Sequence, residues 1–420
     1  MKQTIMVLCL LPTGAGAQTL DECQAAAGNN YPLVKKYELI SKTTDLTLSN
    51  IGKGWWPKIS AAAQATWQNE VVKLPDALSD MMERQGMELK GLAKDQYRLG
   101  IDISQTVYDG GTIRSQKNMA RWQGKVQQAQ NEVDIYAVKK RVNELYFGIL
   151  LLEERLKANA DLQELLASNE QKLADMFKLG VAAESDYHTV VAERLSAIQT
   201  MTELQSQKRM LLQLLGVFCG MEIRHLSKPA GECTNTQNNR PELKWADAQL
   251  KLADAQAQML HANLLPKVSV FATGFYGYPG FDMYKDMFRH RFTLNAMIGA
   301  KVSWNIGALY TLKNDREKIR LQKEQAENFL EVFLFNNRME QMQKNENVAK
   351  YKELMANQER IIALRSSVRK AAESKLAHGI IDVNDLVREI NNENMAKIQL
   401  STHEIEMLKQ IYDLKYTVNN

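Results

Sequence analysis

The residue types that most often do chemistry are scattered along this chain. No serine or cysteine stands with a base and an acid as in a hydrolase, and no glycine-rich phosphate loop is present. The pair Gly110-Gly111 is typical of a turn between a strand and a helix. The histidines occur singly without metal-ligand spacing, so we expect no catalytic activity, no metal and no cofactor. They are His188, His225, His261, His290, His378 and His403.

The cysteines lack the C-x-x-C spacing of a metal or redox site. Beyond the first 17 residues there are three, Cys23, Cys219 and Cys233. An odd number leaves at least one thiol free or paired with another molecule. Cys219 and Cys233 lie on either side of a predicted linker and could form a disulfide, which their spacing alone does not decide.

Charge and composition narrow the class of protein. The 420 residues carry 53 basic and 49 acidic side chains, and this even balance does not indicate a nucleic-acid partner. No stretch of 18 apolar residues occurs, so we expect no transmembrane helix. With only 8 prolines and 22 glycines, the chain has few helix breakers, which predicts long helices.

The first 17 residues have the pattern of a secretory signal peptide. Lys2 precedes the apolar run Ile5–Leu11, and small residues follow from Gly14 to Ala17. This order predicts cleavage after Ala17, although a frayed cytosolic N-terminus is the alternative.

The sequence is duplicated. Trp56–Ser60 recurs as Leu265–Ser269, displaced by 209 positions, and Gly100–Ser104 recurs as Gly299–Ser303, displaced by 199. A length change in one loop accounts for the difference between the two offsets. We therefore predict these segments: a signal peptide 1–17, a first repeat 18–216, a linker 217–239 and a second repeat 240–420.

Each repeat is predicted to contain two β-strands with one apolar and one polar face. Apolar residues alternate with polar ones over 57–68, 97–107, 267–278 and 291–304. Aromatic residues stand near the strand ends, where a membrane interface would place them. Ordinary half-buried strands are the alternative. The aromatic residues are Trp67, Tyr97, Tyr276 and Trp304.

Two proline-free segments, 112–177 and 309–376, predict helices about 100 Å long. We expect Gly180 and Gly379 to cap them in the left-handed conformation. Ser185 and Asp382 are the predicted N-caps of two returning helices, about 185–215 and 382–416.

Four strands per chain are too few for a closed membrane barrel, which needs about 8. Open sheet edges cannot face lipid, so copies of the chain would have to combine. A dimer would supply eight strands around a filled interior and a trimer twelve around a lumen. The polar strand faces and the long helices favour the trimer.

With these elements in order, the chain resembles the TolC-type outer-membrane efflux factors. The resemblance covers essentially the whole chain after residue 17, and it rests on Leu20–Ala25, on Ser104–Gly111 leading into the long helix, and on the two glycine-containing turns. It implies a mainly α-helical homotrimer with a 12-stranded β-barrel in the outer-membrane lipid and a 12-helix barrel in the periplasm. It also implies passive conduction, a periplasmic adaptor protein and an energised inner-membrane transporter in a tripartite efflux or type I secretion system.

The resemblance places the periplasmic tip and gate at the two helical turns. Residues carried over to the tip are Gly180, Ser185, Asp186, Gly379, Asp382, Asp385 and Arg388. In the family, contacts between side chains at the tip keep the channel closed. Leu376, Ile381 and Arg388 depart from the family pattern, so those contacts cannot form here as such. We predict a tip sealed by an Asp385–Arg388 pair, across or within chains; alternatively, Asp385 only supports the start of its helix.

Two other classes of protein are alternatives to an outer-membrane channel. An exported periplasmic coiled-coil structural protein would explain the helices but not the four strands. A soluble enzyme with a helical arm should show a compact α/β pattern, which is absent. The exported substrate, whether drug, metal or protein, leaves no signature in the sequence.

Overall fold

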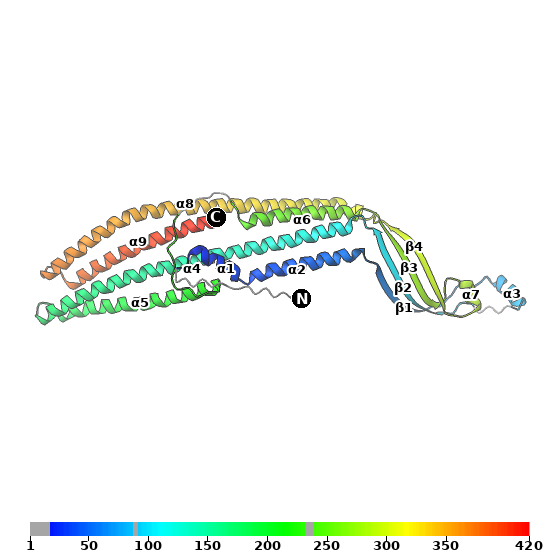
Figure 1. Cartoon of the computed structure of the whole chain (residues 1–420), viewed down its shortest axis with the longest axis horizontal. Helices are drawn as coiled ribbons and strands as arrows, with labels where there is room; N and C mark the ends of the chain where they lie inside the picture. Colours follow the sequence, from blue (N-terminus) through cyan, green and yellow to red (C-terminus); the bar gives the residue numbers. More distant parts are fainter. Residues whose placement is uncertain (1–16, 87–90, 232–237, 420) are drawn as a thin grey trace, which may run out of the picture. The chain divides into compact units, whose positions relative to one another are not determined.

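The computed structural model describes residues 17–86, 91–231 and 238–419 (Figure 1). All of the predicted signal peptide except Ala17 lies outside the described residues. The described residues form two compact units. Of the described residues, the first unit contains 17–38, 128–231, 238–245 and 329–419, and the second contains 39–86, 91–127 and 246–328. Both halves of the sequence contribute to each unit.

Helices make up most of the chain. Their bounds are α1 Leu20–Asn30, α2 Leu33–Gly52, α3 Asp76–Arg84, α4 Thr112–Lys178, α5 Glu184–Cys219, α6 Pro241–Asn263, α7 Met283–Phe288, α8 Ala308–Ala377 and α9 Val383–Val418, with a 3-10 turn η1 at Lys53–Trp55. The strands are β1 Lys58–Trp67, β2 Asp95–Tyr108, β3 Lys267–Tyr278 and β4 Thr293–Ser303. The four predicted strands and the two long helices are confirmed within a few residues.

The unit of residues 39–127 and 246–328 holds one antiparallel sheet in the order β1-β2-β3-β4. Ala61 pairs with Ile101, Ile101 with Gly274 and Gly274 with Ala296, so these residues share one face. The same register places Gln64 beside Arg98 on the other face. The predicted alternation of apolar and polar faces is therefore present in the folded sheet.

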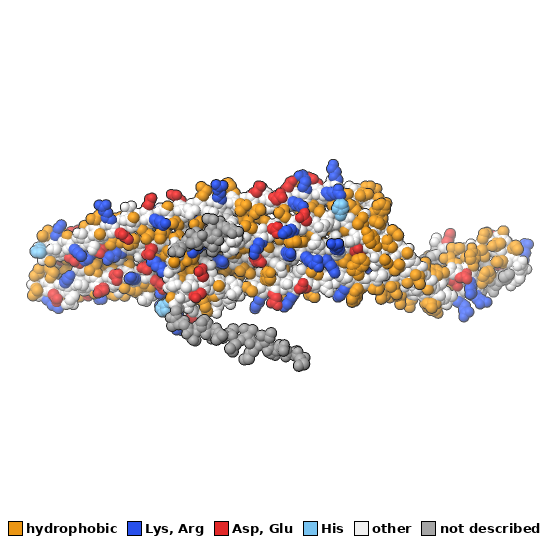
Figure 2. Space-filling view, turned by 45° about the horizontal axis from the view of Figure 1, so that its top comes forward, with side chains coloured by type: hydrophobic (Ala, Val, Ile, Leu, Met, Phe, Trp, Pro, Cys, Tyr) orange, Lys and Arg blue, Asp and Glu red, His pale blue; other side chains and the backbone are white. Residues whose placement is uncertain are grey.

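The apolar face of the sheet is exposed. Leu294 and Ile298 are 81% and 84% exposed, and Ile59, Leu99 and Ile101 are exposed as well. Figure 2 shows hydrophobic side chains gathered over the strands. An exposed apolar area of this extent indicates a surface that contacts lipid or other protein.

Two short helices that the sequence analysis did not predict lie in the strand connections, α3 between β1 and β2 and α7 between β3 and β4. Leu92, Tyr278 and Met287 form a small core here. The carboxylate of the buried Asp286 accepts a 2.6 Å hydrogen bond from the backbone N–H of Gly280. Six or nine residues are too few for helical periodicity to stand out in a sequence.

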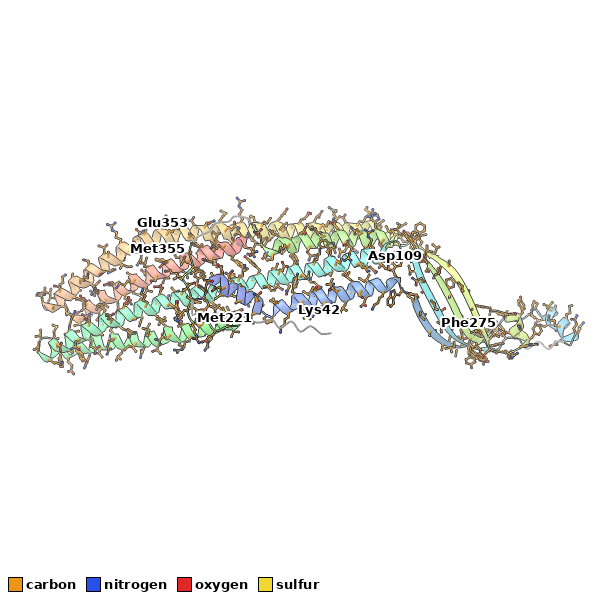
Figure 3. The ribbon with its side chains drawn as sticks, in the orientation of Figure 1. Lys42, Asp109, Met221, Phe275, Glu353 and Met355 are labelled. Atoms are coloured by element: carbon orange, nitrogen blue, oxygen red, sulfur yellow. The ribbon has the colours of Figure 1, made fainter. Side chains whose placement is uncertain are left out.

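The buried Asp109 links β2 to the start of α4 (Figure 3). Its carboxylate accepts hydrogen bonds from the backbone N–H groups of Gly111 at 2.8 Å and Ile113 at 2.6 Å. Gly111 has φ +81°, which suits glycine and makes the tight turn possible. Asp109 therefore satisfies two helix-end donors that would otherwise lack partners.

We expect Asp109→Ala to lower the free energy of unfolding by about 1–2 kcal/mol, the usual cost of removing a helix N-cap side chain. Urea unfolding of detergent-solubilised protein, followed by circular dichroism, measures this loss. Asp109→Asn keeps an oxygen acceptor and serves as the control with a smaller loss. An unchanged midpoint for Asp109→Ala would contradict the capping role.

In the other unit, buried residues of α1, α4, α5 and α9 form the largest part of the core. The Tyr146 hydroxyl lies 2.9 Å from the carbonyl oxygen of Gln18 and 2.5 Å from that of Ser227. Cys23 and Cys219 are both buried, and the Cys219 thiol donates to the Cys23 carbonyl at 3.5 Å. Cys233 lies outside the described residues, so its pairing with Cys219 stays open.

Candidate functional site

The first predicted turn joins α4 to α5. Gly180 has φ +73°, as predicted for a left-handed cap. Its N–H donates to the Phe177 carbonyl at 2.9 Å, and the Val181 N–H donates to the Met176 carbonyl at 2.8 Å. This pair of bonds is the Schellman arrangement, which closes the last turn of α4.

The predicted N-cap at Ser185 is wrong. Helix α5 begins at Glu184, its N-cap is Ala183, and Ser185 already lies inside the first turn. Ala183 has extended backbone angles, and its N–H donates to the Asp186 carboxylate at 3.3 Å. The Asp186 carboxylate thus satisfies the N–H of the N-cap residue, and it also complements the positive end of the helix dipole.

The second turn joins α8 to α9 and repeats the first. Gly379 has φ +69°, and the Ile380 N–H donates to the Lys375 carbonyl at 2.9 Å. Asp382 is the N-cap of α9, as predicted, and its carboxylate accepts from the Asp385 N–H at 2.9 Å. The two turns therefore share one construction, which a Cβ at either glycine would strain.

Asp385 and Arg388 form an ion pair within one chain. The guanidinium donates from Nη2 to Asp385 Oδ1 at 2.7 Å, and the side chains are 38% and 66% exposed for Asp385 and Arg388. Arg388 also lies 3.7 Å from Glu389. The pair is at the start of α9, where Asp385 also interacts favourably with the helix end.

A shared core holds the two turns close to each other. Leu173 and Val190 of the first hairpin pack with Ala372, Leu386 and Ile390 of the second, and all five are buried. Apolar side chains at the turns themselves point into solvent. These are Phe177, Leu179, Val181 and Ile380, with Leu179 78% exposed. The turns thus present an exposed apolar surface that is supported by the buried core between the two hairpins.

The hairpins also carry matched ion pairs of opposite polarity. Glu170 of α4 pairs with Arg194 of α5, whereas Arg369 of α8 pairs with Glu393 of α9. Residues 369 and 393 are displaced by 199 positions from 170 and 194, the offset found between the repeats. Two buried alanines displaced by the same number of positions each accept a hydrogen bond from a glutamine side chain. The carbonyl of Ala197 accepts from Gln163 at 3.3 Å and that of Ala396 from Gln358 at 2.9 Å.

The predicted interface aromatics stand at the ends of the sheet. Trp67 and Tyr97 lie at the end where β1 meets α3 and β2 begins, and Tyr276 lies near the same end of β3. Trp304 follows β4 at the opposite end, where its indole N–H donates to the Leu264 carbonyl at 2.9 Å. All four are exposed, between 47% and 72%. Among the described residues, no helix is long and apolar enough to cross a membrane.

Residues that the sequence analysis passed over lie on the sheet as well. Lys58, Lys267 and Lys301 all fall on its polar face, each opposite a serine. The sequence holds the signal for this placement, because each lysine stands at the same parity as the polar residues of its strand.

Comparison with known protein families and with curated proteins finds no match. Solved structures do match. The outer-membrane channel OprN is 15% identical with a TM-score of 0.69, covering 95% of this chain and 89% of its own. VceC of Vibrio cholerae is 13% identical with a TM-score of 0.68, covering 96% of each chain. The Campylobacter jejuni channel CmeC is 14% identical with a TM-score of 0.65, covering 95% of this chain and 85% of its own.

These likenesses show the fold. They cover 95% and 96% of this chain, so the mainly helical fold with four antiparallel strands, expected from the TolC-type resemblance, is confirmed.

Proposed function

We propose that this chain is the outer-membrane channel of a tripartite efflux or type I secretion system. Three copies form a 12-stranded β-barrel in the outer membrane and a 12-helix barrel in the periplasm, and substrates pass through without chemical change. The predicted signal peptide accounts for export, and the two repeats each supply two strands and one hairpin. The protein is not an enzyme in this proposal, because an inner-membrane transporter supplies the energy.

The observation that carries the proposal is a four-stranded sheet whose apolar face is exposed and whose edges are open. Within the described residues β1 and β4 each pair on one side only. Open edges are unfavourable in lipid, so the strands of further copies must complete the ladder. The fold likeness to outer-membrane channels supports the same arrangement.

Helix α8 supports association of three copies. Exposed apolar residues recur every seven positions at Leu354, Ile361 and Val368, and again at Phe335 and Met342. Such a repeat is typical of a helix that packs along a partner helix. In a trimer this row packs against a neighbouring copy.

The helical turns are the docking surface for a periplasmic adaptor in this proposal. Leu179, Val181 and Ile380 supply exposed apolar area at the turns. The shared core beneath them keeps this surface in shape. The energised transporter would join the assembly through the adaptor.

Membrane fractionation and gel migration test the proposed function. We expect the chain in the outer-membrane fraction, where it migrates as a trimer in unheated detergent samples and as a monomer after boiling. An exported periplasmic coiled-coil structural protein, the alternative function, would appear in the soluble periplasmic fraction. Soluble protein without a heat-modifiable trimer would overturn the channel proposal.

The Asp385–Arg388 pair is proposed to help close the tip. We expect Arg388→Ala to raise single-channel conductance in planar bilayers severalfold, because three unpaired carboxylates repel one another around the axis. Asp385→Ala, which removes the same pair, should also raise it. Asp315→Ala removes an ion pair of the same spacing, between the half-buried Asp315 and the exposed Lys318, and is the control. Unchanged conductance in both tip variants would exclude this gate.

A further inference from the structure

The charged residues of the four strands are divided unequally between the two faces of the sheet. They are Lys58, Asp95, Arg98, Asp102, Lys267 and Lys301. Asp95 pairs with Trp67 at the end of the apolar face, and the register puts the other five on the polar face. The polar face therefore carries four basic groups against the single carboxylate of Asp102.

Three of the basic groups gather at the end of the sheet where the strands meet the long helices. Lys58 lies opposite Ser104, Lys267 opposite Ser303 and Lys301 opposite Ser269. Each lysine thus faces a hydroxyl rather than a carboxylate across the sheet. Lys58 and Lys301 are exposed and Lys267 is half-buried, and none of the three lies directly opposite a carboxylate on these strands.

The fourth basic group, Arg98, is held in place by an aromatic ring. Its guanidinium carbon lies 4.0 Å from the centre of the Phe275 ring, a cation–π contact. Phe275, marked in Figure 3, is buried although it belongs to the polar face. It fits because Gly100 lies beside it, where a Cβ would come within 3.2 Å of the phenylalanine. Phe275, an aromatic residue on the polar face, thus holds the charged side chain of Arg98 in place.

The one acidic group on this face is already engaged. Asp102 accepts a 2.6 Å hydrogen bond from the Thr273 hydroxyl on the neighbouring strand. It stands four positions from Arg98 on the same strand and face. Asp102 pairs with Ser60 and so lies diagonally across from Lys58, but its single charge cannot offset four basic groups.

We propose that the polar strand face makes the pore selective for anionic solutes. The inference rests on the proposed function, in which three copies close the strands with this face toward the lumen. Lys58, Lys267 and Lys301 then form a cationic band, and Arg98 adds a second one further along the strands. Rings of lysine and arginine raise the local concentration of anions and repel cations.

The register argues against a lipid-binding role for these lysines. Lysines that bind lipid phosphate from a barrel wall would stand with the apolar residues, which face the bilayer. Here they share the face of Ser60, Gln64 and Thr66. A lumenal role follows from that placement.

Reversal potentials in planar bilayers across a potassium chloride gradient test the inference. We expect the wild-type trimer to prefer chloride, and the triple variant Lys58→Gln, Lys267→Gln, Lys301→Gln to lose most of that preference while still conducting. Asp102→Asn should increase the preference for chloride. Lys318→Gln removes an exposed lysine of α8 and should leave the reversal potential unchanged.

A wild-type channel that prefers potassium, or a triple variant with the wild-type reversal potential, would overturn the anion preference. In either case the protein still conducts, and the proposed function stands. Absence of any conductance from detergent-stable trimers would instead count against the channel proposal itself. If the triple variant loses binding to anionic-lipid vesicles but keeps its reversal potential, the lysines contact lipid and the inference fails.

Discussion

Replacing Arg240 by methionine is expected to lower the free energy of unfolding by about 3–5 kcal/mol, because it leaves a buried carboxylate without its partner. Arg240 and Glu242 are 8% and 9% exposed. Arg240 Nε donates to Glu242 at 2.9 Å, and Nη1 donates to the Tyr416 carbonyl at 3.2 Å. Its guanidinium carbon also lies within 4.8 Å of the ring centres of Tyr136 and Tyr416.

The surroundings of Arg240 explain why this pair should matter. Arg240 comes directly before α6, and the two tyrosines come from α4 and α9, stacked with ring centres 4.6 Å apart. Burial opposes the charge on Arg240, but the hydrogen bonds and charge of Glu242 outweigh it and raise the pKa of the guanidinium. The arginine therefore remains charged and ties three distant segments together.

A matched pair elsewhere in the chain separates burial from chemistry. Arg224 and Glu222 form the same two-residue-spaced bidentate pair, with both bonds 3.1 Å long, but both side chains are 73% exposed. Arg224→Met should therefore leave the urea midpoint unchanged. Arg240→Met combined with Glu242→Met removes both charges and should recover part of the loss. Equal effects of Arg240→Met and Arg224→Met on the midpoint would contradict the argument.

The contacts of Arg240 also show which features of the fold could not be predicted from the sequence. The strands, the long helices and the glycine turns are local patterns, and they were predictable because periodicity and turn chemistry act over a few residues. Tyr136 and Tyr416 are more than 100 positions away from Arg240, so no spacing points to their contact. The thiol contact between Cys219 and Cys23 is hidden in the same way.

At the candidate site, too, the sequence predicted only features that depend on a few neighbouring residues. Asp382 was recognised as an N-cap because the serine-type capping rule holds there. The Ser185 prediction failed because the helix begins one residue earlier, where the Asp186 carboxylate accepts a hydrogen bond from the N–H of the N-cap residue Ala183. The Asp385–Arg388 spacing predicted an ion pair, but only the structure shows that it closes within one chain.

Reversing the charge of Arg369 is expected to cost about 3–5 kcal/mol as well, because Arg369→Glu would place three carboxylates together on α8 and α9. Arg369 donates from Nε to Glu393 and from Nη1 to Glu373, the latter at 2.5 Å. Lys397 lies 3.0 Å from Glu393. The Arg369 and Glu393 side chains are only 12% and 6% exposed, so water screens little of the repulsion.

The pH dependence of this cluster follows from Glu393. Burial alone would raise the pKa of its carboxyl group, but hydrogen bonds from Arg369 and Lys397 outweigh burial and lower it. A lowered pKa in the folded state means that the cluster stabilises the fold above the ordinary glutamate pKa. This contribution is lost as the pH falls through the lowered pKa. The urea midpoint of Glu393→Gln should therefore vary less with pH in the acidic range than that of the wild type.

The first hairpin provides the rescue experiment, since Glu170 and Arg194 already hold the reversed arrangement at the equivalent positions. Arg369→Glu combined with Glu393→Arg should recover part of the stability lost in the single variant, measured by urea unfolding. Recovery should be incomplete, because Glu373 and Lys397 would then face like charges. The equivalent positions in the first hairpin are Ala174 and Ile198, so adding Glu373→Ala and Lys397→Ile should complete it. No recovery in the fourfold variant would mean that the two hairpins are not equivalent here, and that the polarity of each ion pair is fixed by its own surroundings.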